Sequence, residues 1–437
     1  MTAAPDVLVV GAGFAGVAAA TALAERGARV LVLEARQRPG GRAYSWLDSR
    51  TGEVRDNGQH VLAAFYTETL RLLDRLGTRD ALDIDPTFRI RLWERGRGDY
   101  ELACPDLPHP FQWLAAAGSC ARLSATARVS ALTLHARARA LIARNGDGVA
   151  PTVERWLAGV PGGEDLAVLL RPVAIAALNE VPEEGSALLL ARVLDRLFAS
   201  PAKQSGLALP RRGMGDLFSG FEEFVASRGG EVRYRETALG VRIDGTRATG
   251  VTLLGGTRVD AGVVILAVPH ERAGWIVRPE VLGPAHEATT LPWSPIVSTV
   301  HAYDRPFLPA RFVGMIGTAT QWAFDRGQSA PGRHLVGTVR SAAFRDATRS
   351  VDEIARETDA ELREAFASAG AARLLDANVY KERRATMRST PEAQRLRPGP
   401  KTRVQGLLLA GDWTDTGFPP TIESAVLSGH RAAELAA

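Results

Sequence analysis

The chain has 437 residues, 46% of them hydrophobic, so it can bury a core large enough for two domains. Its 53 Lys and Arg residues nearly balance 49 Asp and Glu residues, and a net charge of only +4 argues against nucleic-acid binding. Cys104 and Cys120 stand alone, without a C-x-x-C motif or a His/Cys cluster, so the sequence predicts neither a disulfide framework nor a metal site and fits a reducing compartment.

The first predicted elements form a nucleotide-binding unit. A strand at residues 6–10 (DVLVV) leads into the turn GAGFAG, an alanine-rich helix, a second strand at residues 29–33 and then Glu34. This order of strand, G-x-G-x-x-G turn, helix, strand and acidic residue is the fingerprint of a dinucleotide-binding fold. A glycine-rich turn without a ligand is the alternative, and the neighbouring elements in register make it the weaker one.

The glycines of this turn have separate expected roles. Gly11 permits the tight turn, Gly13 lets the backbone approach a pyrophosphate at the helix N-terminus, and Gly16 allows the helix to pack closely on the strand. Glu34 would accept hydrogen bonds from the ribose hydroxyl groups of an adenosine. The residues expected around the adenosine and the pyrophosphate are Gly11, Gly13, Phe14, Ala15, Gly16, Glu34, Ala35 and Arg36.

A second glycine pair, Gly40-Gly41, follows the second strand and precedes Arg42. Two exposed backbone N–H groups and a fixed positive charge would form a second clamp on a long diphosphate cofactor. The segment DNGQHVLAAFY comes next, at residues 56–66. A simple nicotinamide domain would continue into another crossover helix after the second strand, so the glycine pair at this position favours a flavin dinucleotide.

A basic segment lies at residues 107–146, which contain five arginines and no Asp or Glu. Leu134, Ala138, Leu141 and Ile142 fall on one helical face, with arginines beside it. Two interpretations stay open: a core-packed helix with a solvated basic side, or an interfacial helix that meets anionic lipid. No apolar run reaches the ~20 residues needed to cross a bilayer, and the N-terminus lacks the basic region of a signal peptide.

The later elements return to the pattern of a cofactor domain. Residues 213–228 predict a helix, and residues 231–269 predict strands separated by glycine turns, ending in the buried run VVILAVP. The chain closes on a strand at residues 407–410, the pair Gly411-Asp412, two prolines and an apolar helix that starts near Thr421.

Together these motifs resemble those of the amine oxidase and phytoene desaturase superfamily of flavoproteins. The resemblance rests on GAGFAG, on PGGR and on the closing GDWTDTGFPPTIESAVLSG. Residues 56–66, 172–187 (PVAIAALNEVPEEGSA) and 206–218 (GLALPRRGMGDLF) are more closely similar to the hydroxysqualene dehydroxylase family within it. The resemblance implies that FAD is the cofactor and is bound non-covalently.

The resemblance also implies where the cofactor touches the chain. It places the backbone of Ala238 at the adenine, Asp412 at the ribityl or pyrophosphate region, and the N-terminus of the last helix at the pyrimidine edge of the flavin. A helix dipole at that edge would stabilise the negative charge of the reduced ring. The further implied contacts are Gly40, Gly41, Arg42, Gly58, Gln59, His60, Gly411, Thr421 and Ile422.

We therefore predict an α/β fold with a Rossmann-type FAD-binding domain assembled from discontinuous segments, and a mixed α+β substrate domain. The FAD-binding domain would comprise residues 1–75, 205–270 and 401–437, and the substrate domain residues 76–204 and 271–400. The predicted location is the cytoplasm. A peripheral position on the inner face of the cytoplasmic membrane, through helices of the substrate domain, is left open by the basic segment.

The narrower resemblance implies an FAD-dependent oxidoreductase that removes the hydroxyl group of hydroxysqualene with hydride from FADH2, giving squalene for hopanoid biosynthesis. Such a reaction needs a dry apolar tunnel and an acid or hydrogen-bond donor that helps water to leave. The candidates near the reacting carbon are His60, Asn179 and Glu180. A structural hydrogen bond for His60 and a surface charge for Glu180 are the alternatives to a catalytic role.

Two other functions stay open at this point. A carotenoid-type desaturase or isomerase would share the fold and the isoprenoid substrate but would move hydride from the substrate to oxidised flavin. A flavin-bearing lipid scaffold would keep FAD for structure alone. An amine oxidase is disfavoured, because Thr416 and Phe418 stand where paired aromatic residues would be expected. The reductive function would require an electron donor that the sequence does not identify.

Overall fold

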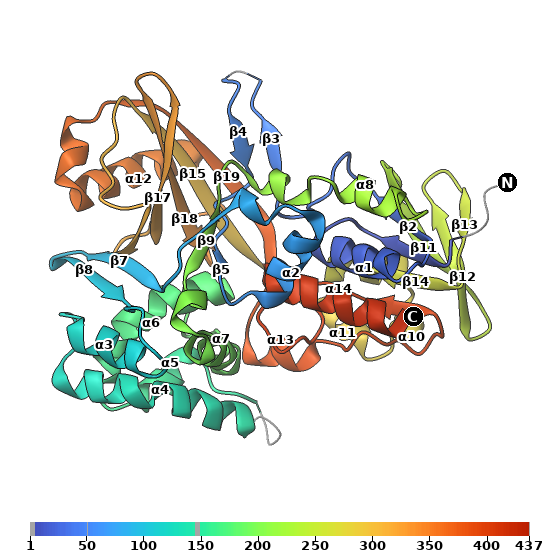
Figure 1. Cartoon of the computed structure of the whole chain (residues 1–437), viewed down its shortest axis with the longest axis horizontal. Helices are drawn as coiled ribbons and strands as arrows, with labels where there is room; N and C mark the ends of the chain where they lie inside the picture. The colour runs from blue at the N-terminus through green and yellow to red at the C-terminus, as the bar shows by residue number, and fades with distance from the viewer. Residues whose placement is uncertain (1–4, 50, 145–148, 437) are drawn as a thin grey trace.

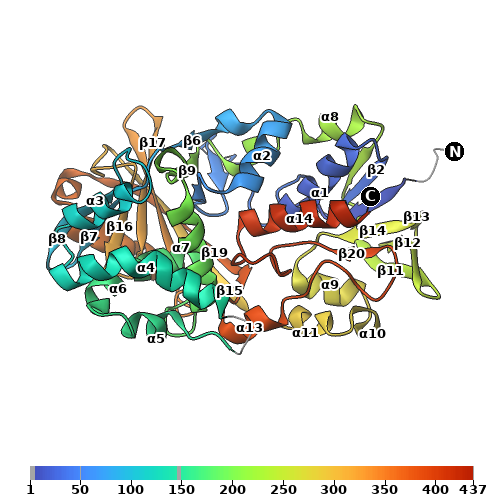
Figure 2. The same cartoon turned by 60° about the horizontal axis from the view of Figure 1, so that its bottom comes forward.

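Two β-sheets organise the computed structural model of the chain, which describes residues 5–49, 51–144 and 149–436. In Figure 1 a parallel sheet lies on the right beside α1, and a larger sheet stands at the upper left. A group of helices, α3 to α7, lies below the larger sheet. Figure 2 shows α14 running along the parallel-sheet side next to α1.

The parallel sheet draws its strands from distant parts of the chain. Its order is β10–β2–β1–β14–β20, and every neighbouring pair is parallel. The strands are, in that order, Glu231–Tyr234, Val30–Glu34, Val7–Val10, Val263–Leu266 and Leu407–Leu409. The predicted α/β fold class, with a Rossmann-type sheet built from discontinuous segments, is confirmed.

Both faces of this sheet are buried, as expected for parallel strands. Val7 and Val9 of β1 pack in the cluster that contains α1 (Phe14–Glu25) and α14 (Ile422–Ala436). Leu8 and Val10 alternate to the other face, in the cluster with the three-stranded antiparallel sheet. The strands of that sheet are β11 (Ala238–Asp244), β12 (Arg247–Leu253) and β13 (Arg258–Asp260).

Three short helices cover the same face as the antiparallel sheet. They are α9 (His270–Ile276), α10 (Pro279–Leu282) and α11 (Ala285–Thr289). Their buried side chains share one hydrophobic cluster with β14 and β20. The domain prediction assigns residues 271–400 to the substrate domain, yet these three helices pack on the parallel sheet. The position of the domain boundary stays a prediction.

The larger sheet is mixed and has the order β19–β15–β18–β17–β16–β7–β8. Helix α12 (Val351–Ala365) covers one face, where the Tyr303 hydroxyl donates to Asp359 at 2.7 Å. The opposite face carries Ile296, Phe324 and Val339, which line the central cavity. The strands are, in sheet order, Leu374–Met387, Trp293–Tyr303, Arg333–Ser341, Trp322–Ala330, Phe312–Ile316, Arg89–Glu94 and Gly98–Ala103.

Helices α3 to α7 share one hydrophobic cluster with β7, β16 and β17. They span Phe111–Ser119, Ala125–Ala143, Val153–Ala158, Gly163–Leu178 and Ala187–Ala199. The predicted apolar face of the basic segment lies on α4, where Leu134 and Ala138 are buried; positions 145 and 146 of that segment lie outside the described residues. Within the described ranges, no helix has both the length and the apolar character needed to cross a bilayer.

Smaller elements connect these layers. The helix predicted at residues 213–228 is divided into a 3₁₀ turn, Met214–Phe218, and α8, Phe221–Ala226, because Gly220 between them adopts a φ of +79°. The other elements are α2 (Thr67–Leu76), α13 (Pro391–Leu396), the hairpin β3 (Ser45–Leu47) and β4 (Val54–Asp56), and the sheet of β5 (Leu62–Ala63), β9 (Leu207–Pro210) and β6 (Leu82–Ile84).

The crossing of α1 and α14 supplies a test of this packing. A Cβ added at Gly429 of α14 would lie 2.1 Å from the carbonyl oxygen of Ala15, at the start of α1. We expect Gly429→Ala to lower the free energy of unfolding by about 1–3 kcal/mol, because such overpacking must push the helices apart. Thermal unfolding followed by circular dichroism measures the change.

The matched control is Gly118→Ala on α3, where nothing lies within 4 Å of an added Cβ. This exchange removes a flexible residue from a helix and should stabilise the protein by about 0.5–1 kcal/mol. Equal stability of the Gly429→Ala variant and the unmodified protein would contradict the close crossing.

Candidate active site

The glycine turn after β1 is held by contacts that only glycine permits. Gly11 has a φ of +103°, its N–H donates to Leu33 at 2.7 Å, and an added Cβ would lie 2.5 Å from the carbonyl oxygen of Ala267. A Cβ at Gly16 would lie 1.8 Å from the carbonyl oxygen of Gly11. The turn therefore brings α1 directly against β1, as the sequence predicts.

The second glycine motif lies against the first. The N–H of Gly40 donates to the carbonyl oxygen of Ala12 at 2.8 Å. A Cβ added at Gly41 would be 3.2 Å from the Cα of Gly13. Gly13 caps α1 without any side-chain hydrogen bond, so the first N–H groups of the helix stay available to an anionic ligand.

Glu34 ties these two loops to the end of β2. One carboxylate oxygen accepts the N–H of Ala12 at 2.7 Å, and the other accepts the N–H of Arg36 at 2.8 Å. The Arg36 guanidinium in turn donates to the carbonyl oxygen of Gly41 at 2.7 Å. Each carboxylate oxygen keeps a second lone pair, which a ribose diol could use.

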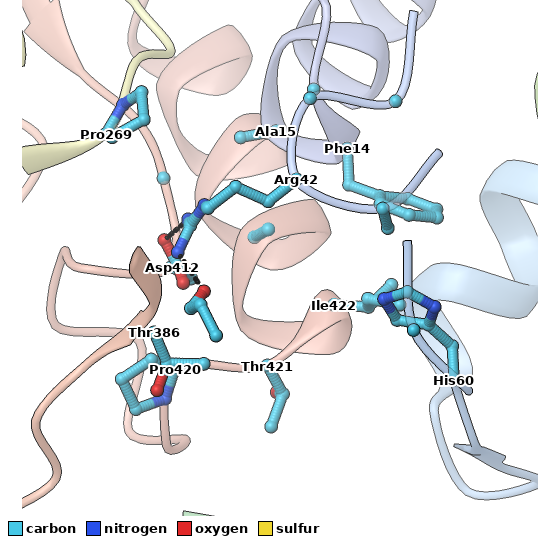
Figure 3. Close-up of a pocket in the computed structure, with 18 of the residues that line it drawn as sticks. Phe14, Ala15, Arg42, His60, Pro269, Thr386, Asp412, Pro420, Thr421 and Ile422 are labelled. Carbon is cyan, nitrogen blue, oxygen red and sulfur yellow. Dashed lines mark hydrogen bonds and ion pairs between the residues drawn. The ribbon is translucent and has the colours of Figure 1, made fainter. Parts of the chain in front are cut away.

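The C-terminal motif meets the second glycine motif through one ion pair. Arg42 donates to the Asp412 carboxylate at 2.5 Å and to the carbonyl oxygen of Ala385 at 2.9 Å, as Figure 3 shows for the first contact. Gly411 donates its N–H to the Ser428 hydroxyl at 2.8 Å, which anchors the turn to α14. Arg42 therefore joins the second glycine motif to the C-terminal motif, in addition to its expected contact with the diphosphate of the cofactor.

The first turn of α14 faces the cavity on one side and α2 on the other. Thr421 and Ile422 point into the cavity in Figure 3, and the Thr421 hydroxyl accepts the N–H of Ser424 at 3.3 Å as a helix cap. Glu423 points away and accepts hydrogen bonds from the backbone N–H groups of Glu68 and Thr69 at 3.0 and 2.9 Å. Burial raises the pKa of the Glu423 carboxyl above its usual value.

His60 also lines the cavity and lies next to Ile422 in Figure 3. Its Nδ1 atom has no hydrogen-bond partner within the described part of the chain. Burial lowers the pKa of the imidazole, so the ring is neutral near pH 7. A neutral imidazole can donate one hydrogen bond, but it cannot transfer a proton as an imidazolium can.

The structure separates Asn179 from Glu180. Asn179 lines the cavity, but its amide donates to the Ser294 carbonyl and the Thr386 hydroxyl and accepts from the Ala342 N–H, at 3.1, 2.9 and 2.7 Å. Its side chain is therefore committed to joining α6 to the larger sheet.

Glu180 is fully buried and does not line the cavity. Arg388 donates to its carboxylate at 2.7 Å and also pairs with Glu184. The surface-charge interpretation of Glu180 is wrong, because the side chain has no exposed area. Its geometry supports a structural ion pair, and nothing in the arrangement brings it to a reacting group.

Several cavity residues escaped the sequence prediction. Tyr66 and Phe65 close the segment DNGQHVLAAFY and line the cavity, so their position in that motif was a usable signal. Thr386 also lines the cavity, and its hydroxyl accepts from Asn179, which leaves its own proton for another acceptor. No motif marks Thr386, because it lies on the long strand β19 and reaches the site only through the fold.

One cavity of about 720 Å³ collects the predicted cofactor residues. All of them line it except Gly16, namely Gly11, Gly13, Phe14, Ala15, Glu34, Ala35, Arg36, Gly40, Gly41, Arg42, Gly58, Gln59, His60, Ala238, Gly411, Asp412, Thr421 and Ile422. The cavity thus extends from Ala238 to Ile422, which suits an extended dinucleotide. The residues present fit FAD, because the N-terminus of α1, the pair Gly40-Gly41 and the Glu34 carboxylate all line this one cavity.

Neither cysteine reaches this cavity, since Cys104 and Cys120 are buried elsewhere. Within the described residues, no group of three His, Cys, Asp or Glu side chains could hold a metal ion.

Curated relatives match this chain over almost its whole length. A hydroxysqualene dehydroxylase of Rhodopseudomonas palustris is 32% identical over 442 residues, which cover 98% of this chain and 97% of the relative. A hydroxysqualene dehydroxylase of Sinorhizobium fredii is 30% identical, with 99% and 98% covered. A 15-cis-phytoene desaturase of an Oncidium hybrid cultivar is 25% identical, with 98% and 77% covered.

Solved structures share the fold at lower identity. An oxidoreductase from Methanosarcina mazei has a TM-score of 0.75 at 17% identity, covering 98% of this chain and 99% of that one. Cyclohexylamine oxidase from Brevibacterium oxydans has a TM-score of 0.71 at 19% identity, with 99% of both chains covered.

The family model described as flavin-containing amine oxidoreductase matches residues 14–437. This range includes the second glycine motif, the larger sheet and the closing helix. Because the match spans nearly the whole chain, the protein belongs to the family of flavin-containing amine oxidoreductases and is an FAD-dependent oxidoreductase.

Proposed function

We propose that the protein removes the hydroxyl group of hydroxysqualene reductively and yields squalene, as a step of hopanoid biosynthesis. In the balanced reaction the anionic reduced flavin, the alcohol and one proton would give FAD, the hydrocarbon and water. A hydride would form the new C–H bond as the C–O bond breaks, and the proton would leave with the hydroxide as water. FAD is bound non-covalently, and a separate electron donor reduces it again. The relatives named hydroxysqualene dehydroxylase support this choice of substrate.

The observation that carries the proposal is the apolar arm of the cavity. Beyond the cofactor residues, the same cavity continues between the larger sheet, α6 and α7. Its walls there include Phe65, Phe88, Ile90, Val193, Leu197, Phe312, Trp322, Phe324 and Val339. A long hydrocarbon would bury its surface against such walls at roughly 25 cal/mol per Å².

The same walls suit a reaction with cationic character. Loss of hydroxide from an allylic carbon develops positive charge, and aromatic faces attract a nearby cation by about 0.5–2 kcal/mol each. Phe65, Phe312 and Phe324 supply such faces and are buried. Exclusion of water by these side chains also protects a developing cation from hydration.

Two neutral donors could bind the hydroxyl group of the substrate. The Thr386 hydroxyl accepts a hydrogen bond from the Asn179 amide at 2.9 Å, and its own O–H is free to donate to another group. His60 lies on the other side of Thr421 in Figure 3 and is neutral because burial lowers its pKa. In this proposal Asn179 orients Thr386 and takes no proton itself, and Glu180 keeps its ion pair with Arg388.

The test is an anaerobic mixing experiment. Photoreduced protein mixed with hydroxysqualene should reoxidise its flavin and produce squalene, measured by absorbance and mass spectrometry. Reoxidation is expected with hydroxysqualene and not with phytoene. Bleaching of the oxidised protein by phytoene would select the desaturase function, and silence towards both lipids would select a flavin-bearing scaffold.

Variants of the two donors refine this experiment. His60→Ala and Thr386→Val should each slow squalene formation by about 10²–10⁴-fold if the side chain acts as the donor in the transition state. FAD content should stay unchanged, as measured by the flavin absorbance of the purified protein. Full turnover by either variant removes that side chain from the donor role.

A second part of the proposal concerns the place of the protein in the cell. It lies in the cytoplasm and meets the inner face of the membrane through the α3–α4 surface, formed by Phe111, Val129, Leu132, Arg137, Arg139 and Arg144. Phe111, Val129 and Leu132 are 57%, 64% and 50% exposed. Apolar side chains beside cations suit the interface of an anionic bilayer.

Not all five arginines of the basic segment serve this surface. Arg122 pairs with Glu94 at 2.7 Å and with Asp165 at 2.9 Å, and it is nearly buried. Arg128 donates to the carbonyl oxygen of Cys120 at 3.2 Å. The remaining cations of α4 and its C-terminus stay at the surface, with the Arg139 side chain 73% exposed.

Charge reversal tests the membrane proposal. The triple variant Arg137→Glu, Arg139→Glu and Arg144→Glu should release the protein from anionic liposomes in a sedimentation assay. The matched control is Arg247→Glu, Arg258→Glu and Arg278→Glu, which changes the net charge equally at exposed positions on or near β12, β13 and α10. Unchanged sedimentation of the first triple variant eliminates the α3–α4 surface as the lipid contact.

A further inference from the structure

Arg397 is an arginine buried beneath the loop that leads into α14. It follows α13 and is only 6% exposed. Its guanidinium donates to the carbonyl oxygens of Asp412 and Thr414 at 2.8 and 2.6 Å, to that of Phe418, and to the Ser424 hydroxyl at 3.2 Å. All of these acceptors are neutral, so the side chain is well bonded but not paired in charge.

The surrounding carboxylates are committed elsewhere. No carboxylate among the described residues forms an ion pair with Arg397, whereas the nearby Arg42 is paired with Asp412. Asp412 is already neutralised by Arg42 at 2.5 Å. The Asp415 side chain is 47% exposed and lies 4.0 Å from Arg192. Near the Asp412 turn, the three cations Arg42, Arg192 and Arg397 therefore face two carboxylates, the buried Asp412 and the half-exposed Asp415, which leaves one positive charge in excess.

An unpaired charge inside a protein is unfavourable unless something offsets it. Burial lowers the pKa of Arg397 to about 10, so the guanidinium is still protonated at neutral pH. The residues that it binds flank Pro420 and Thr421, which line the cavity at the first turn of α14. The positive end of the α14 dipole points the same way. A ligand that carries negative charge at this wall would supply the missing partner.

Glu423 is the opposing group on this turn. Its carboxylate lies on the far side, where it accepts hydrogen bonds from two backbone N–H groups and the Thr69 hydroxyl at the start of α2. Burial raises the pKa of this carboxyl. The N-terminus of α2 therefore stabilises the charge of Glu423, so Glu423 does not neutralise Arg397.

We propose that Arg397 supplies a buried positive charge that favours reduced over oxidised flavin and so raises the redox potential of the bound FAD. Reduced flavin carries more negative charge at its pyrimidine edge than oxidised flavin. Arg397 lies behind the turn at the start of α14, which would face that edge if FAD binds as the family resemblance implies. Arg397 does not line the cavity, so it acts through the field of its charge and as a positioning residue for the Asp412–Ser424 segment.

The experiment compares midpoint potentials of the full-length, FAD-loaded protein, measured anaerobically by equilibration with a reference dye. In Arg397→Gln the equilibrium ratio of reduced to oxidised flavin should fall at least tenfold. For a two-electron couple this corresponds to a midpoint potential about 30 mV more negative. Arg397→Lys keeps the charge and should stay near the unmodified potential. Arg395→Gln, which removes an exposed charge two residues away, should change nothing.

Two results would overturn the proposal. One is an unchanged potential in Arg397→Gln. The other is an equal decrease in Arg397→Lys and Arg397→Gln, which would assign the effect to hydrogen-bond geometry alone.

The unmodified protein gives an independent measurement in case the glutamine variant does not hold FAD. If the site keeps the reduced flavin anionic, one proton is taken up per two electrons, and the midpoint potential falls by about 30 mV per pH unit into the mildly acidic range. A slope of about 59 mV per pH unit there means that a neutral reduced flavin is bound, and this result refutes the proposal. None of these readouts uses turnover, so they are independent of the hydroxysqualene proposal.

Discussion

The contact on which the rest of the site depends is the ion pair between Arg42 and Asp412. It joins a residue of the second glycine motif to a residue of the C-terminal motif, and the second bond of Arg42, to the Ala385 carbonyl, adds the long strand β19 of the larger sheet. The second glycine motif thus meets, at one guanidinium, two segments that follow it by more than 300 residues. The glycine loops, the closing helix and the apolar arm of the cavity can share one space because this junction holds them in register.

Much of the cofactor site could be predicted because its residues are local in the sequence. Gly11, Gly16 and Gly40 are demanded by close backbone contacts within a few residues of a strand end, and such contacts leave a readable pattern. The same holds for β20 and the Gly411-Asp412 turn that follows it. Parallel pairing of β1 with β2 and β14 also follows from short, fully buried apolar runs.

The residues that sequence reasoning missed act across long distances. Thr386, Glu423 and Arg397 have roles only because α6, α2 and the Asp412 turn are brought to them by the fold. Asn179 and Glu180 are neighbours in one sequence motif, yet their side chains point to different sides at the C-terminus of α6. The cause is the backbone of Asn179, which adopts a φ of +48°. The sequence pattern does not reveal this change of backbone direction. In the same way, Gly220 divides a segment whose periodicity predicts one helix.

The parallel sheet has a consequence for how the protein is made. Strand β14 cannot pair with β20 until about 140 further residues have been synthesised, and α14, the helix that packs on α1, is made later still. Pairings so distant in sequence form late and slowly. During translation the nascent chain therefore exposes the apolar edge of β14 and one side of α1, and the cofactor can be enclosed only after α14 has been synthesised.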